Sequence, residues 1–536
     1  MKLASFSAIA LASVLLISCT VAPTKAAAKG ASALPATASG ANVDESQAKQ
    51  VLFVNNQSSS ASDSNPGTEA QPFLTVSQGA RAAQALNQQG IGVRVYIEPG
   101  IYREQVSFIQ ASQGTNFPVI FEGTLRGKVI LDGADVWNTG WQQIGPNLYQ
   151  HAWPYAWGLA PYPQGWQGNV VLQDIVRRRE MVFVNGHNVT QVLQQSDLTD
   201  FSFFVDENAQ LLYLQLGSNL ALSGAAIEVA IRPRVFEIQN KQNVVLRDLV
   251  FQHGNAAVQD PGVQVDGSNN ILIEGCAFQW NNWIGLSLSA TTNISLLNNT
   301  ADRNGGTGFD IYNMKNLVVD SNETSFNNWR GARGAFYGWS VAGAKLGGVH
   351  LGRVSNHNSA GNRARGLWLD YDNRDVTVDT ATLVWNFNDG IFVEANPGPI
   401  LVQNSTMSNN QNASGISGAN SSDVTLLNNS IAGNTVEQIL ITGDLDRTVV
   451  NWETNTQANI QATRWTIKSN TVTSQDSSQA LMVLSQNWTP FLTTLSADYN
   501  VWTAGGQQLF GVGPQWLTFP QWQSLVQADL TSVFQP

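Results

Sequence analysis

The most constraining feature of the sequence is a repeat of roughly 24 residues, a period typical of solenoids, that runs from Val244 to Trp465. In a solenoid each coil packs only on its neighbours. Short strand-like segments begin at nine positions, at successive intervals of 27, 23, 23, 32, 27, 24, 24 and 41. The shortest intervals then correspond to bare coils, and the longer ones to coils that carry loops. The nine positions are Val244, Ile271, Ile294, Leu317, Val349, Val376, Ile400, Val424 and Trp465.

The composition and the turns favour β structure. Only 12% of the residues are charged and 43% are hydrophobic, and the remainder is rich in small polar residues that suit strands joined by tight turns. Several coils share a polar turn, as in residues 297–300 (LNNT) and 427–430 (LNNS). Stacked asparagine side chains can satisfy backbone groups from coil to coil in a parallel solenoid.

This periodicity, with three short strands per coil, resembles the right-handed parallel β-helix of pectate-lyase-like proteins over residues 50–500. The expected fold class is therefore all-β, a right-handed parallel β-helix with a coil of about 24 residues. Residues 49–136 are expected to form N-terminal coils and a cap, with a short helix at 77–89, and residues 236–500 the main β-helix. Residues 501–536 are expected to close the C-terminal end, because an open coil would expose an edge strand.

Residues 137–235 break the repeat. This stretch is rich in Trp and Tyr and contains a hairpin pattern around residues 206–208 (DEN). We interpret it as an inserted β-rich subdomain or lid. Its segment 153–168 combines aromatic residues with Pro and Gly, and aromatic residues on a loop favour a functional role.

The N-terminus predicts export. Residues 1–19 combine a charged start, a short apolar core and the sequence LISC at 16–19, as in secretory signals that are too short to span a bilayer. The LISC ending resembles the lipobox of bacterial lipoproteins, which implies lipidation of Cys19 and attachment to the outer membrane; an ordinary signal peptide is the alternative. Residues 20–48 are expected to be a flexible tether. The net charge of -11 argues against nucleic acid, or an anionic membrane surface, as a partner.

A five-residue pattern recurs once per coil and points to a functional face. Its second and fourth positions are nearly always aliphatic and should fill the core, so strand alternation turns the third and fifth positions outward. The pattern is found at residues 285–289, 308–312, 366–370, 390–394, 415–419 and 438–442. The outward residues of its central copies are Asp310, Tyr312, Trp368, Asp370, Phe392 and Glu394.

Asp370 and Glu394 each end one copy of the pattern, and the two copies belong to successive coils. Neighbouring strands are about 4.8 Å apart, so one full coil should place the two carboxyl groups roughly 5 Å from each other. Retaining glycosidases hold their two catalytic carboxyl groups at about 5 to 5.5 Å, and like charges at this distance favour one ionised and one protonated group. The pair therefore predicts a catalytic dyad; solvated surface carboxylates or a calcium site are the alternatives.

The residues around the dyad also resemble a known family. GLWLD at 366–370, followed one coil later by FVEANPGP at 392–399, is similar to the active-site region of glycoside hydrolase family 120. Members of this family are β-helical β-xylosidases with an inserted β-sandwich. DSNPGT at 63–68 and GIYRE at 100–104 are similar to the family too, but many secreted β-helix proteins share them. The resemblance implies that Asp370 is the nucleophile and Glu394 the acid/base, with an oligosaccharide or polysaccharide as substrate.

Two other functions are consistent with the same residues. Lys345 precedes the dyad by one coil, in GWSVAGAK at 338–345, and it could stabilise Asp370, contact a sugar or be a loop charge. In a polysaccharide lyase, Lys345 would be the base and residues 370–375 (DYDNRD) could bind calcium. The third alternative is a surface lipoprotein that binds glycans without catalysis. For the preferred glycosidase we expect no metal or cofactor, and we expect the sugar site to be lined by Lys345, Asp310, Tyr312, Trp368, Phe392 and Trp339.

Overall fold

A computed structural model describes residues 34–110, 115–443, 447–486, 488–504 and 509–536. The predicted signal peptide, Cys19 and the first part of the predicted tether lie outside these residues. Among the residues that are described, no helix is both long enough and apolar enough to cross a membrane.

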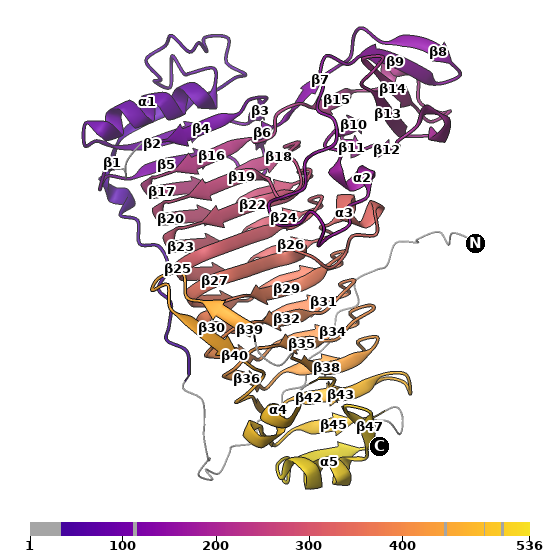
Figure 1. Cartoon of the computed structure of the whole chain (residues 1–536). Coiled ribbons are helices and arrows are strands. Elements are labelled where there is room, and N and C mark those ends of the chain that lie inside the picture. The colour runs from indigo at the N-terminus through magenta and orange to yellow at the C-terminus, as the bar shows by residue number, and fades with distance from the viewer. Residues whose placement is uncertain (1–33, 111–114, 444–446, 487, 505–508) are drawn as a thin grey trace. The chain divides into compact units, whose positions relative to one another are not determined.

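The described chain winds into a parallel β-helix with three strands per coil (Figure 1), as the sequence predicts. Each strand pairs in parallel with the equivalent strands of the coils before and after it, which gives three ladders. Two strands of twelve and fourteen residues, β25 and β27, bend across a corner and belong to both the first and the second ladder.

The first ladder consists of β4 (Val106–Ile109), β16 (Phe236–Gln239), β19 (Pro261–Asp266), β22 (Ile284–Ser289), β25 (Phe309–Asp320), β27 (Ala342–Ser355), β29 (Arg365–Asp370), β32 (Ile391–Glu394), β35 (Ile416–Ala419), β38 (Glu437–Thr442), β43 (Ala480–Leu484) and β46 (Phe510–Val512). The second ladder adds to β25 and β27 the strands β1 (Ala48–Val54), β2 (Gly92–Ile97), β5 (Val119–Gly123), β17 (Gln242–Arg247), β20 (Asn269–Glu274), β23 (Thr292–Leu297), β30 (Arg374–Asp379), β33 (Ile400–Gln403), β36 (Val424–Leu427), β41 (Thr466–Lys468) and β44 (Ser496–Asp498). The third ladder consists of β3 (Gly100–Tyr102), β6 (Val129–Asp132), β18 (Val250–Gln252), β21 (Ala277–Gln279), β24 (Thr300–Asp302), β26 (Glu323–Ser325), β28 (Asn358–Ala360), β31 (Thr382–Val384), β34 (Thr406–Ser408), β37 (Ser430–Ala432), β42 (Thr471–Thr473), β45 (Val501–Thr503) and β48 (Val533–Gln535).

The predicted register is correct for most coils and wrong at one. Ile271 pairs with Ile294, and Val376 with Ile400, as the spacing predicts. Leu317, however, pairs with Gly352 rather than with Val349. The glycine interrupts the apolar pattern of β27, so the pattern in the sequence pointed to the nearest valine, which lies too early in the strand.

Buried asparagines hold the coils together at the turn between the third and the first ladder. Asn304, Asn327, Asn362, Asn386, Asn410 and Asn434 lie one above another in six consecutive coils. Each side-chain carbonyl accepts from the backbone and the side chain of the asparagine in the preceding coil, at 2.9 to 3.2 Å. Asparagines of the predicted LNNT and LNNS turns make the same bonds in two separate short stacks, from Asn299 to Asn322 and from Asn429 to Asn470, which agrees with the expected role of those turns.

The glycine that opens the five-residue pattern is needed for this packing. A Cβ atom at Gly366 would lie 2.6 Å from the carbonyl oxygen of Gly390 and 2.7 Å from the amide nitrogen of Asn386. Gly390 is confined in the same way by Asn410 and Gly415. The pattern is therefore a direct consequence of close coil stacking beside the asparagine ladder.

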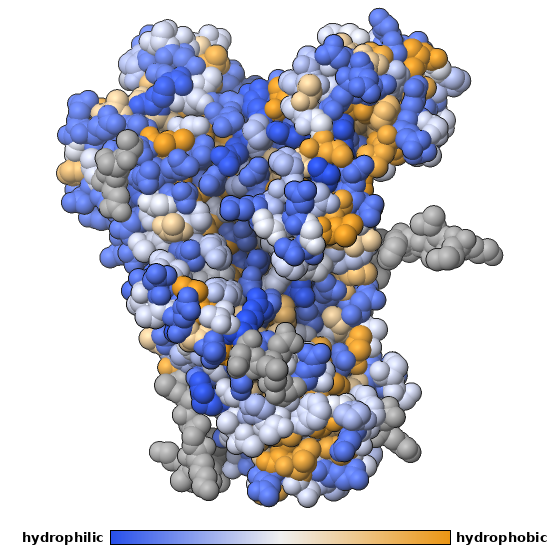
Figure 2. Space-filling model, in the orientation of Figure 1, coloured by the Kyte–Doolittle hydropathy of each residue, from blue (hydrophilic) through white to orange (hydrophobic). Residues whose placement is uncertain are grey.

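Aliphatic side chains fill the interior along the whole length, as in the nearly fully buried Leu367, Leu369, Ile391 and Val393. At the N-terminal end α1 (Val76–Gln88) covers the first coils, which agrees with the predicted helix at 77–89. At the C-terminal end α5 (Phe519–Val526) packs on β47 (Gln515–Leu517). Strands β45 and β48 of the third ladder lie within residues 501–536, so the solenoid continues into the region that the sequence predicts to be a C-terminal cap. Figure 2 shows apolar atoms gathered near this end on a largely hydrophilic face.

Part of the segment predicted as a flexible tether is instead bonded to the coils. The backbone nitrogens of Ser39 and Gly40 donate to Asn316 at 2.8 and 3.0 Å, and that of Asn42 donates to Asn270 at 2.6 Å. The outward-turned asparagines of the second ladder thus provide acceptors for an extended chain. The small polar composition that suggested a tether also suits a strand-like strap on a polar surface.

Residues between β6 and β16 form a subdomain with its own core. It contains a four-stranded and a five-stranded sheet, which include the predicted hairpin, here β13 (Ser202–Asp206) and β14 (Leu211–Gln215). A short helix, α2 (Asp174–Arg177), ends a loop that returns to the coils. The remaining strands are β7 (Ala134–Val136), β8 (Gln142–Gly145), β9 (Leu148–Ala152), β10 (Val182–Val184), β11 (His187–Asn188), β12 (Thr190–Gln191) and β15 (Ile227–Ala230).

Replacing Asn386 with Ala should destabilise the solenoid. The variant loses the ladder bonds of Asn386 and leaves the buried amide of Asn362 without its acceptor; a buried unsatisfied polar group costs about 1 to 3 kcal/mol. We expect the free energy of unfolding, measured by urea denaturation, to fall by about that amount. Asn219→Ala, at an exposed position of the subdomain, is the control. Equal stability of the two variants would show that the ladder contributes little.

Candidate active site

The structure places the predicted site residues, apart from Trp339 in the loop before β27, in two parallel rows on the outer face of the first ladder. One row runs through the third position of the pattern, with Asp310 beside Lys345, Lys345 beside Trp368 and Trp368 beside Phe392. The other row runs through the fifth position. There Tyr312 lies beside Gly347, Gly347 beside Asp370 and Asp370 beside Glu394.

Asp370 and Glu394 are direct register partners on the adjacent strands β29 and β32. Neighbouring strands are about 4.8 Å apart, so this pairing separates the backbones of the two residues by one strand spacing; the predicted carboxyl separation stays a prediction. Both carboxylates line a pocket of about 540 Å³, a volume within the range of small-molecule sites. Its wall also contains Trp166, Trp339, Lys345, Arg365, Trp368, Phe392 and Arg447.

Lys345 forms an ion pair with Asp370, with 3.0 Å between Nζ and Oδ2. Burial lowers the pKa of Lys345, but Asp370 and Asp310 outweigh that effect and hold the pKa above its ordinary value. Lys345 is therefore held as a cation beside Asp370. It occupies the third position of the pattern at Gly343-Ala344-Lys345-Leu346-Gly347, a copy that is hard to recognise in the sequence because its last residue is glycine.

Asp310 and Tyr312 lie beside the pocket rather than in its wall. Burial raises the pKa of the Asp310 carboxyl, with Lys345 opposing the shift and Asp370 adding to it. Tyr312 is 48% exposed. Its ring occupies the space that a side chain at Gly347 would fill, because a Cβ atom there would lie 2.9 Å from the ring. The glycine thus lets Tyr312 lean across one coil towards Asp370.

Arg365 lies over the rings of Trp368 and Phe392, two of the predicted lining residues. The guanidinium carbon of Arg365 lies 4.4 Å from the ring centroid of Trp368 and 4.5 Å from that of Phe392. Trp368 is only 7% exposed and donates from Nε1 to Glu394 at 3.2 Å. A cation held over two ring faces is favourable in a partly desolvated site. Trp368 therefore positions Glu394, and the exposed aromatic residue of the pocket is Trp339, at 50%.

Two residues of the pocket were not foreseen from the sequence. Arg447 forms an ion pair with Glu394, although 53 residues separate them. Trp166 comes from the inserted subdomain and contacts Trp339 with a ring-centroid distance of 6.3 Å. The only sequence signals were the long interval before Trp465, which predicted a loop, and the aromatic segment 153–168.

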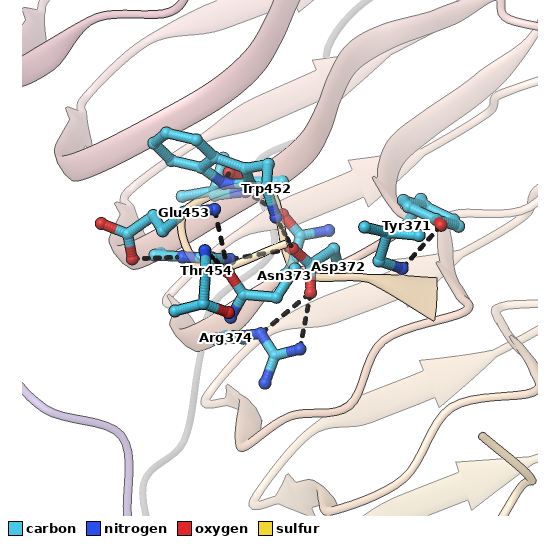
Figure 3. A network of polar contacts seen from close by, with 12 residues as sticks. Tyr371, Asp372, Asn373, Arg374, Trp452, Glu453 and Thr454 are labelled. Carbon is cyan, nitrogen blue, oxygen red and sulfur yellow. Dashed lines mark hydrogen bonds and ion pairs between the residues drawn. The ribbon is translucent and has the colours of Figure 1, made fainter. Parts of the chain in front are cut away.

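Arg447 begins a two-stranded hairpin of β39 (Arg447–Val450) and β40 (Gln457–Ile460), which lies against the second ladder (Figure 1). Its tip is fixed by the polar network in Figure 3, where Asp372 accepts from Arg374 at 2.8 Å and from the backbone of Trp452 at 3.2 Å. Tyr371 accepts from the Val450 backbone at 2.8 Å. The hairpin is thus held in the position that brings Arg447 to Glu394.

His350 is the titratable part of this network. Its ring nitrogens lie 2.7 Å from Glu453 and 3.1 Å from Asp372, and Glu453 also pairs with Lys315 at 2.7 Å. Burial lowers the pKa of His350, but the hydrogen bonds to Asp372 and Glu453 outweigh it and raise the pKa above its ordinary 6.5. Protonated His350 therefore bridges the coils and the hairpin.

This bridge predicts that the stability of the hairpin at residues 447–460 depends on pH. Because the folded pKa of His350 is raised, its stabilisation is fully present below pH 6.5 and is lost as pH rises through the folded pKa. We expect His350→Gln to speed amide hydrogen exchange in residues 447–460 at low pH, and the difference from the wild type to shrink as pH rises. His187→Gln, at an exposed histidine of the subdomain, is the control. A difference that does not change with pH would contradict the bridge.

The carboxylates proposed for calcium do not fit a calcium site. Lys345 is bonded to Asp370, while His350 and Arg374 are bonded to Asp372, and the side-chain amide of Asn373 is engaged in a coil-to-coil ladder. The oxygens are thus matched by cations and donors of the protein itself. In the described part of the chain no group of three or more His, Cys, Asp or Glu side chains is placed to hold a metal ion.

Comparison with known proteins agrees with this architecture. A family model described as a right-handed beta helix region matches residues 234–338. The chain is a right-handed parallel β-helix. A search among curated proteins finds no match.

Solved structures share the fold over most of the β-helix. The structure of XylC in complex with xylose superposes with a TM-score of 0.69 at 14% identity, covering 91% of this chain and 86% of that one. The A-module of the mannuronan C-5 epimerase AlgE4 from Azotobacter vinelandii superposes with a TM-score of 0.50 at 14% identity, covering 86% of this chain and 96% of that one.

Proposed function

We propose that this β-helix is a retaining glycoside hydrolase, with Asp370 as the nucleophile and Glu394 as the acid/base. The observation that carries the proposal is the direct register pairing of these two carboxylates in the wall of one pocket. A pair at roughly one strand spacing, about 4.8 Å, leaves no room for a water between the two groups and matches retention rather than inversion.

The two carboxylates have surroundings suited to different roles. The cation of Lys345 favours ionised Asp370, whose oxygen attacks the anomeric carbon while the bond to the leaving oxygen breaks. Glu394, positioned by the Nε1–H group of Trp368, gives its proton to that leaving oxygen. It then accepts a proton from the water that releases the sugar from Asp370.

Arg447 has to move for this cycle to begin. Its ion pair occupies one oxygen of Glu394, and the leaving oxygen of the substrate needs access to that carboxyl group. Arg447 is the more exposed partner, at 39% against 17% for Glu394. We therefore expect the entering sugar to displace Arg447 from Glu394.

The comparisons support a carbohydrate substrate in general terms. The solved XylC structure contains xylose, and its likeness to this chain extends over most of both proteins. The family resemblance of the GLWLD and FVEANPGP segments also favours a β-xylosidase-like activity. An exported lipoprotein anchored through Cys19, acting on oligosaccharides released from larger polymers, is consistent with both.

A polysaccharide lyase is less well supported. A lyase base must take up a proton, whereas Asp370 and Asp310 hold the pKa of Lys345 above its ordinary value despite its burial. A raised pKa makes Lys345 a poorer acceptor for the proton that such a reaction abstracts. Glycan binding without catalysis gives no reason for pairing two carboxylates beneath a cation.

Asp370→Ala and Glu394→Gln should each abolish most of the activity without unfolding the protein, because both side chains point outward from the coil. We expect a loss of at least about 10² to 10⁴-fold in turnover of aryl glycosides by Glu394→Gln, and a loss of similar size or larger by Asp370→Ala. For the wild-type protein, NMR of the first product formed should show that the anomeric configuration is retained. Asp379→Asn, on the outer side of β30, is the control. Wild-type turnover in either variant would remove that residue from the mechanism.

Lys345→Met separates the hydrolase from the lyase. Under the proposal, the wild type should release reducing ends from oligosaccharides without the ultraviolet absorbance of an unsaturated uronate. The variant should release them more slowly, because it removes the cation that pairs with the nucleophile Asp370. Assays of xylan fragments, pectin and alginate measure both signals together. Absorbance that appears with the wild type and disappears with Lys345→Met would show that the protein is a lyase and not a hydrolase.

A further inference from the structure

A second pocket of about 380 Å³ lies beside the turns that follow the third ladder. Its wall comes from three parts of the chain: the corners after β21, β24, β26 and β28, the short helix α3 (Trp329–Arg333), and Asn188 of the subdomain. It shares no lining residue with the catalytic pocket. The residues used below are Asn188, Trp280, Phe326, Trp329, Arg333 and Arg363.

The pocket is cationic and lacks matching acids. Arg303, Arg333 and Arg363 all line it, and none of the described lining residues carries a carboxylate. Arg303 is paired with Asp302 outside the wall. Burial lowers the pKa of Arg333 to about 10, and the like charge of Arg363 adds to the shift. The positive charges of Arg333 and Arg363 thus repel one another, and none of the lining residues supplies an acid to offset them, so a bound anion would be stabilised here.

Three hydrogen-bond donors in the wall have no partner in the described part of the chain. Nη1 of Arg333, Nε1 of Trp329 and Nδ2 of Asn188 are each buried and unbonded. Buried polar groups are nearly always hydrogen-bonded. All three are donors, so the missing partner is a molecule rich in acceptor oxygens.

Aromatic rings form the apolar part of the same wall. Trp280 and Phe326 each follow the last residue of a third-ladder strand and adopt positive φ angles of 52° and 54°, a conformation unusual for bulky residues. Phe326 is 52% exposed. Its ring fits over Gly361, where a Cβ atom would lie 2.8 Å from it. The guanidinium carbon of Arg303 lies 5.1 Å from the ring centroid of Phe326 and 5.9 Å from that of Trp280, so the corners form an aromatic and cationic wall beside the unpaired donors.

We propose that this pocket binds an acidic sugar, a hexuronate unit of a glycan. Its carboxylate would pair with Arg333 and Arg363 in the bidentate geometry that guanidinium groups provide. Its ring would stack on Phe326 or Trp280, and its hydroxyl oxygens would accept from Trp329 and Asn188. The site is distinct from the proposed catalytic dyad and does not depend on hydrolysis at Asp370.

Calorimetric titration of the purified full chain tests the site. The probes are oligogalacturonate and oligoalginate, with neutral xylo-oligosaccharides of equal length and inorganic phosphate as comparisons, all with the Asp370→Ala protein so that no probe is consumed. We expect saturable binding of at least one uronate probe, weakened by salt. Arg363→Ala should weaken it by about ten-fold or more, because it removes a charged hydrogen bond. Arg81→Ala, on the exposed side of α1, should have no effect.

The outcomes separate this site from its alternatives. Arg333→Lys keeps the positive charge but removes the paired N–H donors of the guanidinium group. Weaker binding by this variant therefore supports the bidentate contact, even if other replacements at this partly buried residue fail to fold. Binding that is lost in Arg447→Ala but kept in Arg363→Ala would place the uronate in the catalytic pocket and overturn the proposal. Equal affinity for the neutral probes, binding of phosphate but not of uronates, or no saturable binding of either uronate would also overturn it.

Discussion

The rest of the structure depends on the register between successive coils. Backbone hydrogen bonds fix the spacing along each ladder, and the buried asparagines fix the turns, because every side-chain carbonyl in the ladder accepts from the coil before it. A slip of one residue would turn every outward side chain into the core. The same constraint that keeps Leu367 and Ile391 inside therefore aligns Asp370 with Glu394 outside.

Charges of opposite sign alternate around the resulting pair. Lys345 lies between Asp310 and Asp370, and Arg447 closes on Glu394 from the hairpin. Each carboxylate of the dyad is thus matched by one cation, but the two cations differ in how firmly they are held. Lys345 belongs to a coil strand, whereas Arg447 belongs to an inserted hairpin. This difference in support accords with the different roles proposed for the two carboxylates.

Insertions into an otherwise regular solenoid create both pockets. The subdomain between β6 and β16 supplies Trp166 to the pocket of the proposed dyad and Asn188 to the cationic one. The chain between β26 and β27 contributes Trp339 to the first pocket and Trp329 to the second. A bare β-helix has a flat outer face, and ligands need walls. The insertions therefore provide the depth that the coils cannot.

The sequence by itself determined the coil, the direction of its side chains and the neighbours along each row. A regular solenoid period with strict alternation leaves one parallel arrangement, and in it residues such as Asp370 and Glu394 must meet. Only the tertiary structure decided that Arg365 covers Trp368, that Arg447 reaches Glu394, and that Arg333 faces Arg363. The physical reason is that these contacts are made by long side chains and inserted segments, whose paths no repeat constrains. The coil repeat in the sequence specifies the backbone of this protein, and the segments inserted into the repeat form its pockets.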